Sequence, residues 1–323
     1  MYFFSSNLGD NLNYYLLKDM IDGNIKFYDR TLPKTSDIFW DQNNIKKLND
    51  VAKIDLFFIG SILDTICNWS YIFHNPNNKY KSTISKWYFK IVDYFFPLII
   101  FGTGFISPQK RLKESYIRNL KIIALRGNIT LQRLKRNGVK LPKNVVLADP
   151  GILAPMLINI TNISELNYTK KYNLCIIPHY VDKKKNKTIK RRIHVNNSII
   201  LNIEQNPINF LESILQCKNV ISSGLHGLII SDSLGIPNMR MRLSNRILGG
   251  SYKFEDYYSA YGLKSPPKIN LLRSIFKEKH LKYLRSNYAI SKDKIRKKQC
   301  ELLSNFPFKL KKKYEIIRNI ICK

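Results

Sequence analysis

The chain has 323 residues, of which 44% are apolar and 12% aromatic, so it can bury a sizeable core and lacks the composition of a disordered protein. Its length fits two domains better than one. Lysine and arginine (54) exceed aspartate and glutamate (23), which gives a net charge of +31. This excess has three interpretations: a lysine-rich surface, an anionic substrate or membrane, or nucleic acid. The sequence contains no recognisable nucleic-acid-binding motif, so we expect no nucleic-acid partner.

Basic residues gather in two places, residues 183–192 and the tail from residue 277 onward. The tail also carries Ile, Leu, Phe and Tyr at near-helical spacing, which predicts C-terminal amphipathic helices of the kind that rest on anionic lipid. The longest apolar run, residues 95–106, is shorter than the about 20 residues that cross a bilayer, and residues 1–5 do not resemble a signal peptide. We therefore expect a cytoplasmic protein with peripheral contact to the inner face of the membrane.

The five cysteines are scattered along the chain at positions 67, 175, 217, 300 and 322. No two of them form a Cys-x-x-Cys pair, and their spacing fits no metal site. An odd, scattered set is typical of a reducing cytosol, so we expect neither disulfides nor a metal centre.

Short, uniformly apolar runs that end at glycine or at a small polar residue recur along the chain. They are residues 56–59, 98–101, 121–125, 145–148, 174–177 and 220–221. Uniform rather than alternating apolar runs indicate strands that are covered on both faces, as in parallel sheets. Helical patterns lie between several of them, at residues 128–137, 208–216 and 225–234.

Alternation of strands and helices predicts an α/β fold with parallel sheets. Two Rossmann-like domains fit the pattern, one over residues 1–165 and one over residues 166–323, with the boundary in the polar stretch 158–171. Ligands of such sheets bind beyond the carboxyl ends of the strands, so we expect the chemistry at those turns.

The segment from Ser222 to Gly227 is the turn best suited to a ligand. A short strand enters two serines and a glycine, and a helix begins within Leu225-His226-Gly227. The first turn of a helix offers unpaired N–H groups and a partial positive charge, which favour a carboxylate or phosphate. His226 can donate to that anion or move a proton. The alternative is a serine-capped helix with an ordinary histidine.

Seven elements in order resemble the polysaccharide pyruvyl transferase family. They include a Gly-Asp element near the N-terminus, an Arg-Gly-x-x-Thr element, a Ser-x-Leu-His-Gly signature and a Lys-x-x-Asp-Tyr-Tyr element. The matching segments are residues 7–13, 102–104, 125–130, 149–151, 177–180, 223–227 and 253–258. Gly-Asp or Asp-Pro-Gly alone is weak, but seven elements in the family's order are a specific signal. The tail after about residue 265 is not covered.

The resemblance implies transfer of a pyruvyl group from phosphoenolpyruvate to a sugar, forming a ketal. It also implies two domains that face each other across a cleft, as in glycosyltransferases of the GT-B type. Phosphoenolpyruvate is then a co-substrate, and no cofactor or metal is expected. The acceptor is a sugar or a lipid-linked oligosaccharide of surface polysaccharide synthesis. The remaining alternative is a GT-B glycosyltransferase, which uses similar glycine turns and helix-bound phosphates.

Site residues follow from the matching positions. The expected catalytic residues are His226 and Asp10. The expected donor-binding residues are Ser222, Ser223, Leu225, Gly227, Arg126, Arg240 and Arg242. Some family members carry arginine directly before the Leu-His pair, whereas this chain has Gly224 there, so the arginine that holds the donor must come from elsewhere.

The acceptor side is assigned to seven residues, which are Asn7, Asn11, Asp149, His179, Lys253, Asp256 and Tyr257. Several assignments have structural alternatives. Asp10 precedes an apolar-periodic stretch and could cap that helix. Asp149 precedes proline and could form a turn, Arg126 could be a surface residue beside a helix, and the segment 253–258 could be a packed loop.

Overall fold

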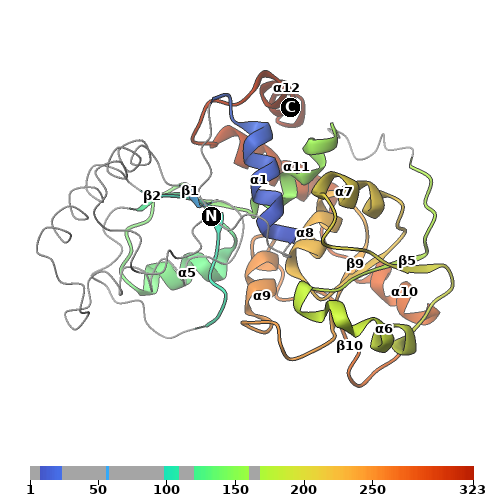
Figure 1. The fold of residues 1–323 in the computed structure, drawn as a ribbon. Coiled ribbons are helices and arrows are strands. Elements are labelled where there is room, and N and C mark those ends of the chain that lie inside the picture. Colours follow the sequence, from blue (N-terminus) through green and yellow to red (C-terminus); the bar gives the residue numbers. More distant parts are fainter. Residues whose placement is uncertain (1–7, 24–55, 58–97, 109–119, 160–167) are drawn as a thin grey trace, which may run out of the picture.

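The computed structural model describes residues 8–23, 56–57, 98–108, 120–159 and 168–323. Two parallel sheets organise these residues (Figure 1). The first has the strand order β1-β2-β3-β4 and the second the order β10-β9-β8-β5-β7. A separate pair joins β6 (Ile193–His194) to β11 (Phe276–Lys277). The predicted α/β class with parallel sheets is therefore confirmed.

The strands of the first sheet are β1 (Leu56–Phe57), β2 (Leu98–Thr103), β3 (Leu120–Leu125) and β4 (Val146–Leu147). Those of the second are β5 (Leu174–Ile177), β7 (Ser198–Ile200), β8 (Val220–Ser222), β9 (Asn238–Arg242) and β10 (Lys268–Asn270). Each of the six predicted apolar runs contains a strand. The strands that the sequence did not predict are short or polar: β9, for example, alternates buried Met239 and Met241 with arginines.

The helices are α1 (Leu8–Met20), α5 (Asn128–Arg136), α6 (Asn186–Arg192), α7 (Pro207–Leu215), α8 (Leu225–Ser233), α9 (Tyr252–Ser259), α10 (Glu278–Ser286), α11 (Lys292–Ser304) and α12 (Lys312–Ile321). Two 3-10 segments, η2 (Pro150–Ile158) and η4 (Tyr180–Lys185), follow strand ends. Helix α7 begins with an N-cap at Asn206, which accepts a hydrogen bond from the Ile208 N–H at 2.9 Å. Gly235, with φ of +63°, follows the end of α8, as expected for a helix stop.

Helix α1 lies against elements from the other end of the chain. Figure 1 shows α1 beside α7, α8 and α11, and its Leu12, Leu16 and Met20 are fully buried in one core cluster with Phe210 and Leu228. Burial of these apolar side chains holds the N-terminal helix next to the second sheet. The domain boundaries predicted from the sequence stay a prediction.

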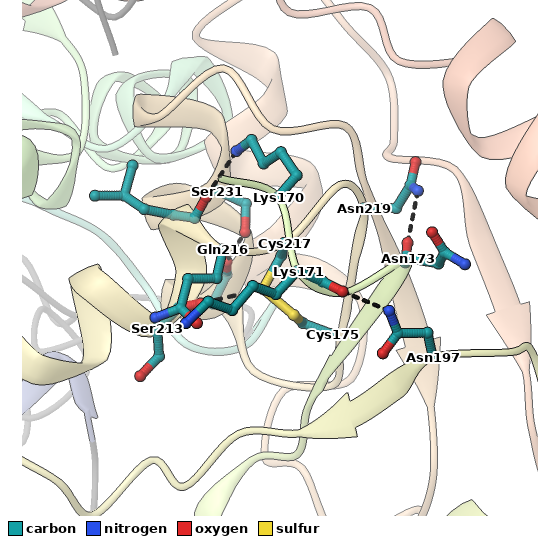
Figure 2. Close-up of a disulfide and its surroundings, with 12 residues drawn as sticks. Lys170, Lys171, Asn173, Cys175, Asn197, Ser213, Gln216, Cys217, Asn219 and Ser231 are labelled. Carbon is teal, nitrogen blue, oxygen red and sulfur yellow. Dashed lines mark hydrogen bonds between the residues drawn. A yellow bond between two sulfur atoms is a disulfide. The ribbon is translucent and has the colours of Figure 1, made fainter. Parts of the chain in front are cut away.

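Four of the five cysteines form disulfides, which corrects the expectation of unpaired thiols. Cys175 of β5 is joined to Cys217, with 5.8 Å between their Cα atoms, and Figure 2 shows this bridge with polar residues from neighbouring segments, such as Lys170 and Asn197. Cys300 of α11 is joined to Cys322 after α12, with 5.2 Å between Cα atoms. The partners are 42 and 22 residues apart, so only the fold brings them together. Because disulfides are rare in reducing compartments, the cysteines no longer support a cytosolic location. Cys67 lies outside the described residues.

Candidate active site

Three strands of the second sheet end at the same edge. The register aligns Ile177 of β5 with Ser222 of β8, and Ser222 with Arg240 of β9. The residues that follow, including His179 and Ser223, therefore meet beyond the carboxyl ends of parallel strands, where α/β sheets bind ligands. The sequence predicted this edge as the site.

Both serines of the predicted donor turn make hydrogen bonds within the protein. The Ser222 hydroxyl lies 3.1 Å from the Ile177 carbonyl and 2.8 Å from the Gly224 carbonyl. The Ser223 hydroxyl donates to Asp182 at 2.9 Å and accepts the N–H of His179 at 2.8 Å. These bonds fix the turn between β8 and α8, so the serines shape the site, and direct donor contact stays a prediction.

The same turn brings two further predicted residues into place. Leu225 is the first residue of α8 and is buried. A β-carbon at Gly227 would lie 2.4 Å from the Ser222 hydroxyl, so only glycine lets α8 start this close to the strand end. The first backbone N–H groups of α8 have no helical partner and are directed toward this edge. Asp182, which is fully buried, was missed because it precedes a run of lysines.

His226 lies against the backbone of Gly9 in α1. A β-carbon at Gly9 would lie 2.1 Å from both Nδ1 and Cε1 of the imidazole, so this approach requires glycine. The His226 Nε2 atom is buried and has no hydrogen-bond partner among the described residues. A buried polar atom without a partner is costly, and in a native site it points to a ligand.

Burial and nearby cations keep His226 neutral. The pKa of His226 is lowered to about 3, chiefly by burial and then, in that order, by Lys253, Arg126 and His179. The pKa of His179 is also lowered to about 3, by burial and then by Lys253. Lys253, on α9, thus lies close enough to act on both imidazoles, and α9 brings a charge to the turn that carries His226.

Arg126 and Asp256 form a fully buried ion pair. Arg126 Nε donates to Asp256 Oδ2 at 2.8 Å, and the guanidinium also donates to the Phe105 carbonyl. Asp256 further accepts the N–H of Thr130 at 2.8 Å and its hydroxyl at 2.7 Å. Both side chains are fully buried, so Arg126 is not a surface residue. Donor binding by Arg126 and acceptor binding by Asp256 stay predictions, whereas the pair joins the turn between β3 and α5 to α9.

Two glycines make this ion pair possible. A β-carbon at Gly104 would lie 2.6 Å from Arg126 Nη2, and one at Gly127 would lie 1.7 Å from the Asp256 carbonyl oxygen. Side chains at either position would push α9 away from the first sheet. The glycine turn, the Arg-Gly-x-x-Thr element and the Lys-x-x-Asp-Tyr-Tyr element are therefore one structural unit.

Asp149 and Tyr257 lie inside the protein. Asp149 Oδ1 accepts the Gly151 N–H at 2.9 Å, which makes the predicted turn at the start of η2, while Oδ2 is buried without a partner among the described residues. Burial raises the pKa of Asp149 to about 7. Tyr257 is fully buried and packs edge-on against Tyr261, with ring centroids 5.3 Å apart. Contact of either side chain with a sugar has no support in the described conformation.

The two arginines of β9 differ in their surroundings. The Arg240 guanidinium lies 4.0 Å from the ring centroid of Phe254 on α9 and donates to the Gly250 carbonyl at 3.0 Å. It is half-buried beside Ser222, so it borders the site. Arg242 is exposed and donates to Asn245 at 2.7 Å. Of the two, Arg240 is therefore better placed for a donor anion.

The N-terminal predictions fall on α1. Asp10 is the third residue of that helix, so the backbone corrects the alternative that Asp10 is the N-cap. Asn11 follows it and is half-buried. Asn7 lies outside the described residues. Since Gly9 contacts His226, this turn of α1 borders the same site.

Residues 7–245 match the sequence profile of the polysaccharide pyruvyl transferase family. The chain belongs to the polysaccharide pyruvyl transferase family. It is also 33% identical, over 169 residues, to an uncharacterized protein of Acanthamoeba polyphaga mimivirus, a match that covers 51% of this chain and 55% of that protein. The chain thus spans about half the length of this curated relative.

A solved structure of a functionally uncharacterized protein from Klebsiella pneumoniae aligns with 82% of this chain and 88% of its own. The TM-score is 0.40 and the sequence identity 14%. A likeness at this level carries no conclusion about fold or function.

The described residues of this chain include no group of three or more His, Cys, Asp or Glu placed to hold a metal ion. No helix in the described ranges is long and apolar enough to cross a membrane. The expectations of no metal and no cofactor stay predictions.

A buried carboxyl on α8 gives the stability of the protein a testable pH dependence. Burial raises the pKa of Asp232 from its usual 3.8 to about 7, while Asn238 donates to it at 2.6 Å. The folded protein keeps the proton that the unfolded chain releases, so this stabilisation is full below pH 3.8 and is lost as the pH rises to about 7. Relative to the wild type, we expect the free energy of unfolding of Asp232→Asn to rise by roughly 3–4 kcal/mol between pH 4 and pH 8.

Urea unfolding of both proteins at several pH values measures this gain. Asparagine at position 232 keeps an acceptor for Asn238 and removes only the titrating carboxyl. The stability of each protein at pH 4 is therefore the reference for its stability at higher pH. A difference between the two proteins that does not change with pH contradicts the raised pKa.

Proposed function

We propose that the chain transfers the pyruvyl group of phosphoenolpyruvate to a sugar of a surface polysaccharide or its precursor, forming a pyruvate ketal. The observation that carries the proposal is the neutral imidazole of His226, with its buried and unpartnered Nε2, at the start of α8. Around it gather the N-terminal dipole of α8 and the charge of Lys253, a setting that suits an anion carrying phosphate and carboxylate.

The reaction needs an acid, a base and cationic groups. Protonation of the methylene carbon of phosphoenolpyruvate makes a cationic centre at C2. One sugar hydroxyl adds to C2 and loses its proton, the C2–O bond to phosphate breaks, and a second hydroxyl closes the ketal. The sum is one phosphoenolpyruvate and one sugar diol giving one ketal and one phosphate, with no oxidant and no metal in the balance.

The low pKa of His226 keeps its imidazole neutral and able to donate a hydrogen bond to the phosphate, but makes it a weak base in the free protein. An anionic donor beside the ring raises this pKa, which makes His226 a better acceptor for the proton of a sugar hydroxyl. In this proposal Arg240 holds the donor anion together with Lys253, which the sequence assigned to the acceptor side. Asp10 and Asn11 bind the acceptor, and the Arg126–Asp256 pair positions α9.

The two-domain arrangement forms part of the proposal. We place the acceptor side in residues 1–165 and the donor site in residues 166–323, facing each other across a GT-B-like cleft. The contact of Gly9 with His226, and of Arg126 with Asp256, supports a site that takes residues from both parts. The partners are phosphoenolpyruvate and a sugar or lipid-linked acceptor at the inner face of the membrane.

Two measurements on the full chain test the function. Isothermal titration calorimetry should show binding of phosphoenolpyruvate, and none of 3-phosphoglycerate at the same concentration. Addition of a panel of methyl glycosides should then release inorganic phosphate. Release of nucleotide from sugar nucleotides, without binding of phosphoenolpyruvate, would instead identify a GT-B glycosyltransferase and overturn the proposal.

A further inference from the structure

The outer face of α12 combines apolar and basic residues in an unusual way. Its inner face, formed by Tyr314, Ile317 and Ile321, is buried in the main core. On the adjoining, outer face Ile316 and Ile320 are 51% and 45% exposed. Residues four apart on a helix are neighbours, so the two isoleucines form one apolar patch where a soluble helix normally carries polar residues.

Cations surround this patch. Residues 292–323 contain eleven lysines and arginines against three aspartates and glutamates, a net charge of +8. Lys312 begins α12 one turn before Ile316, and Lys323 follows Ile320 by three residues; both lysines are exposed. An apolar stripe flanked by lysines is the pattern of a helix that lies in a lipid interface.

Several contacts hold α12 in a fixed position. Tyr314 donates to Asp19 of α1 at 2.6 Å, and the Lys311 N–H donates to the Met20 carbonyl at 2.8 Å. Arg296 of α11 donates to the carbonyls of Ile321 and Ile320 at 3.0 and 2.8 Å. The Cys300–Cys322 disulfide joins the same two helices. The patch is thus presented on a rigid support.

We propose that the outer face of α12 docks on the surface of an anionic lipid bilayer, with Ile316 and Ile320 inserted among the headgroups. A second copy of this chain is the less suitable occupant, because two molecules of charge +31 repel each other. Nucleic acid would use the lysines and leave the isoleucines without a role.

The position of α12 relative to the candidate active site also suits this proposal. Figure 1 shows α12 beside one end of α1, and Asp19 at that end lies ten residues from Gly9, or about 15 Å along the helix. Docking of α12 would therefore hold the site close to a lipid-linked acceptor. Only this last step rests on the proposed function.

Co-sedimentation with vesicles tests the docking without any turnover. Vesicles of phosphatidylcholine with 30% phosphatidylglycerol should bind the full chain at least tenfold more strongly than pure phosphatidylcholine vesicles, roughly as expected from several lysines near the surface. The double variant Ile316→Ser/Ile320→Ser should bind about tenfold more weakly than the wild type. Circular dichroism should show no loss of helix, since both side chains are exposed.

The matched control is Leu272→Ser/Tyr283→Ser, which removes two exposed apolar side chains away from α12 without changing the charge. It should bind vesicles like the wild type. Equal loss in both double variants, equal binding to neutral vesicles, or an effect of the isoleucine pair on self-association in sedimentation velocity overturns the docking. A chain that binds vesicles but does not bind phosphoenolpyruvate overturns the proposed function alone.

Discussion

His226→Ala is expected to lower kcat/KM for transfer from phosphoenolpyruvate by about 10²- to 10⁴-fold, the range that a positioned acid–base group contributes. The physical reason is the placement of the imidazole at the start of α8, against Gly9, with Nε2 directed to no protein partner in the described structure. Phosphate release at varied donor concentration measures the effect.

Substitutions at and near His226 separate its two roles. His226→Gln keeps a hydrogen-bond donor near the position of Nε2 and moves no proton, so recovery of activity in this variant would show an anchoring role. Gly9→Val crowds the ring and should lower activity in the same direction as alanine at position 226. His194→Ala, at an exposed histidine, should have no effect. Undiminished transfer by His226→Ala would remove His226 from the site.

The strand ends that form the candidate site can be predicted from the sequence because their signals are local. Uniform apolar runs mark buried parallel strands, and the small residues that end them mark the edge where ligands bind. Gly224 and His226 lie at such an edge, and the structure places the helix start at Leu225 as the pattern predicts. The strand β9 is not predicted in this way, because its alternating methionines and arginines are typical of a strand with one polar face and do not form a uniform apolar run.

The roles of individual side chains depend on partners that are far away in the sequence. Ser222 and Ser223 look like donor ligands until Ile177 and Asp182, more than 40 residues earlier, are seen to bind their hydroxyls. The pairing of Cys175 with Cys217 is hidden for the same reason. Local spacing carries no information on such contacts, since tertiary packing alone decides them.

The ion pair of Arg126 with Asp256 shows this limit most clearly, because 130 residues separate its members. We expect Asp256→Ala to destabilise the protein by about 3–5 kcal/mol, since it removes the carboxylate that pairs with the fully buried Arg126 and leaves the Thr130 N–H without this acceptor. Urea unfolding at pH 7 measures the loss. Activity should fall as well, because α9 also carries Lys253.

An exposed ion pair of the same geometry is the control for this prediction. Lys183 and Glu204 are also 2.8 Å apart, but their side chains are 51% and 40% exposed. Glu204→Ala should therefore cost less than about 1 kcal/mol, because solvent already screens that pair. Similar losses in the two variants would mean that burial does not set the strength of the Arg126–Asp256 contact.

The double variant Arg126→Met/Asp256→Leu separates two contributions to the lost stability. One is the cost of burying the Arg126 charge without Asp256, and the other is the loss of the contact between the two side chains. Replacing both partners removes the uncompensated arginine, so we expect the double variant to recover about half of the stability that Asp256→Ala loses. The remainder reflects the Thr130 N–H and the Phe105 carbonyl, which keep no charged partner. If the double variant is less stable than Asp256→Ala, the ion pair contributes more to stability than the cost of burying its own charges. The position of α9 beside His226 then depends on this pair.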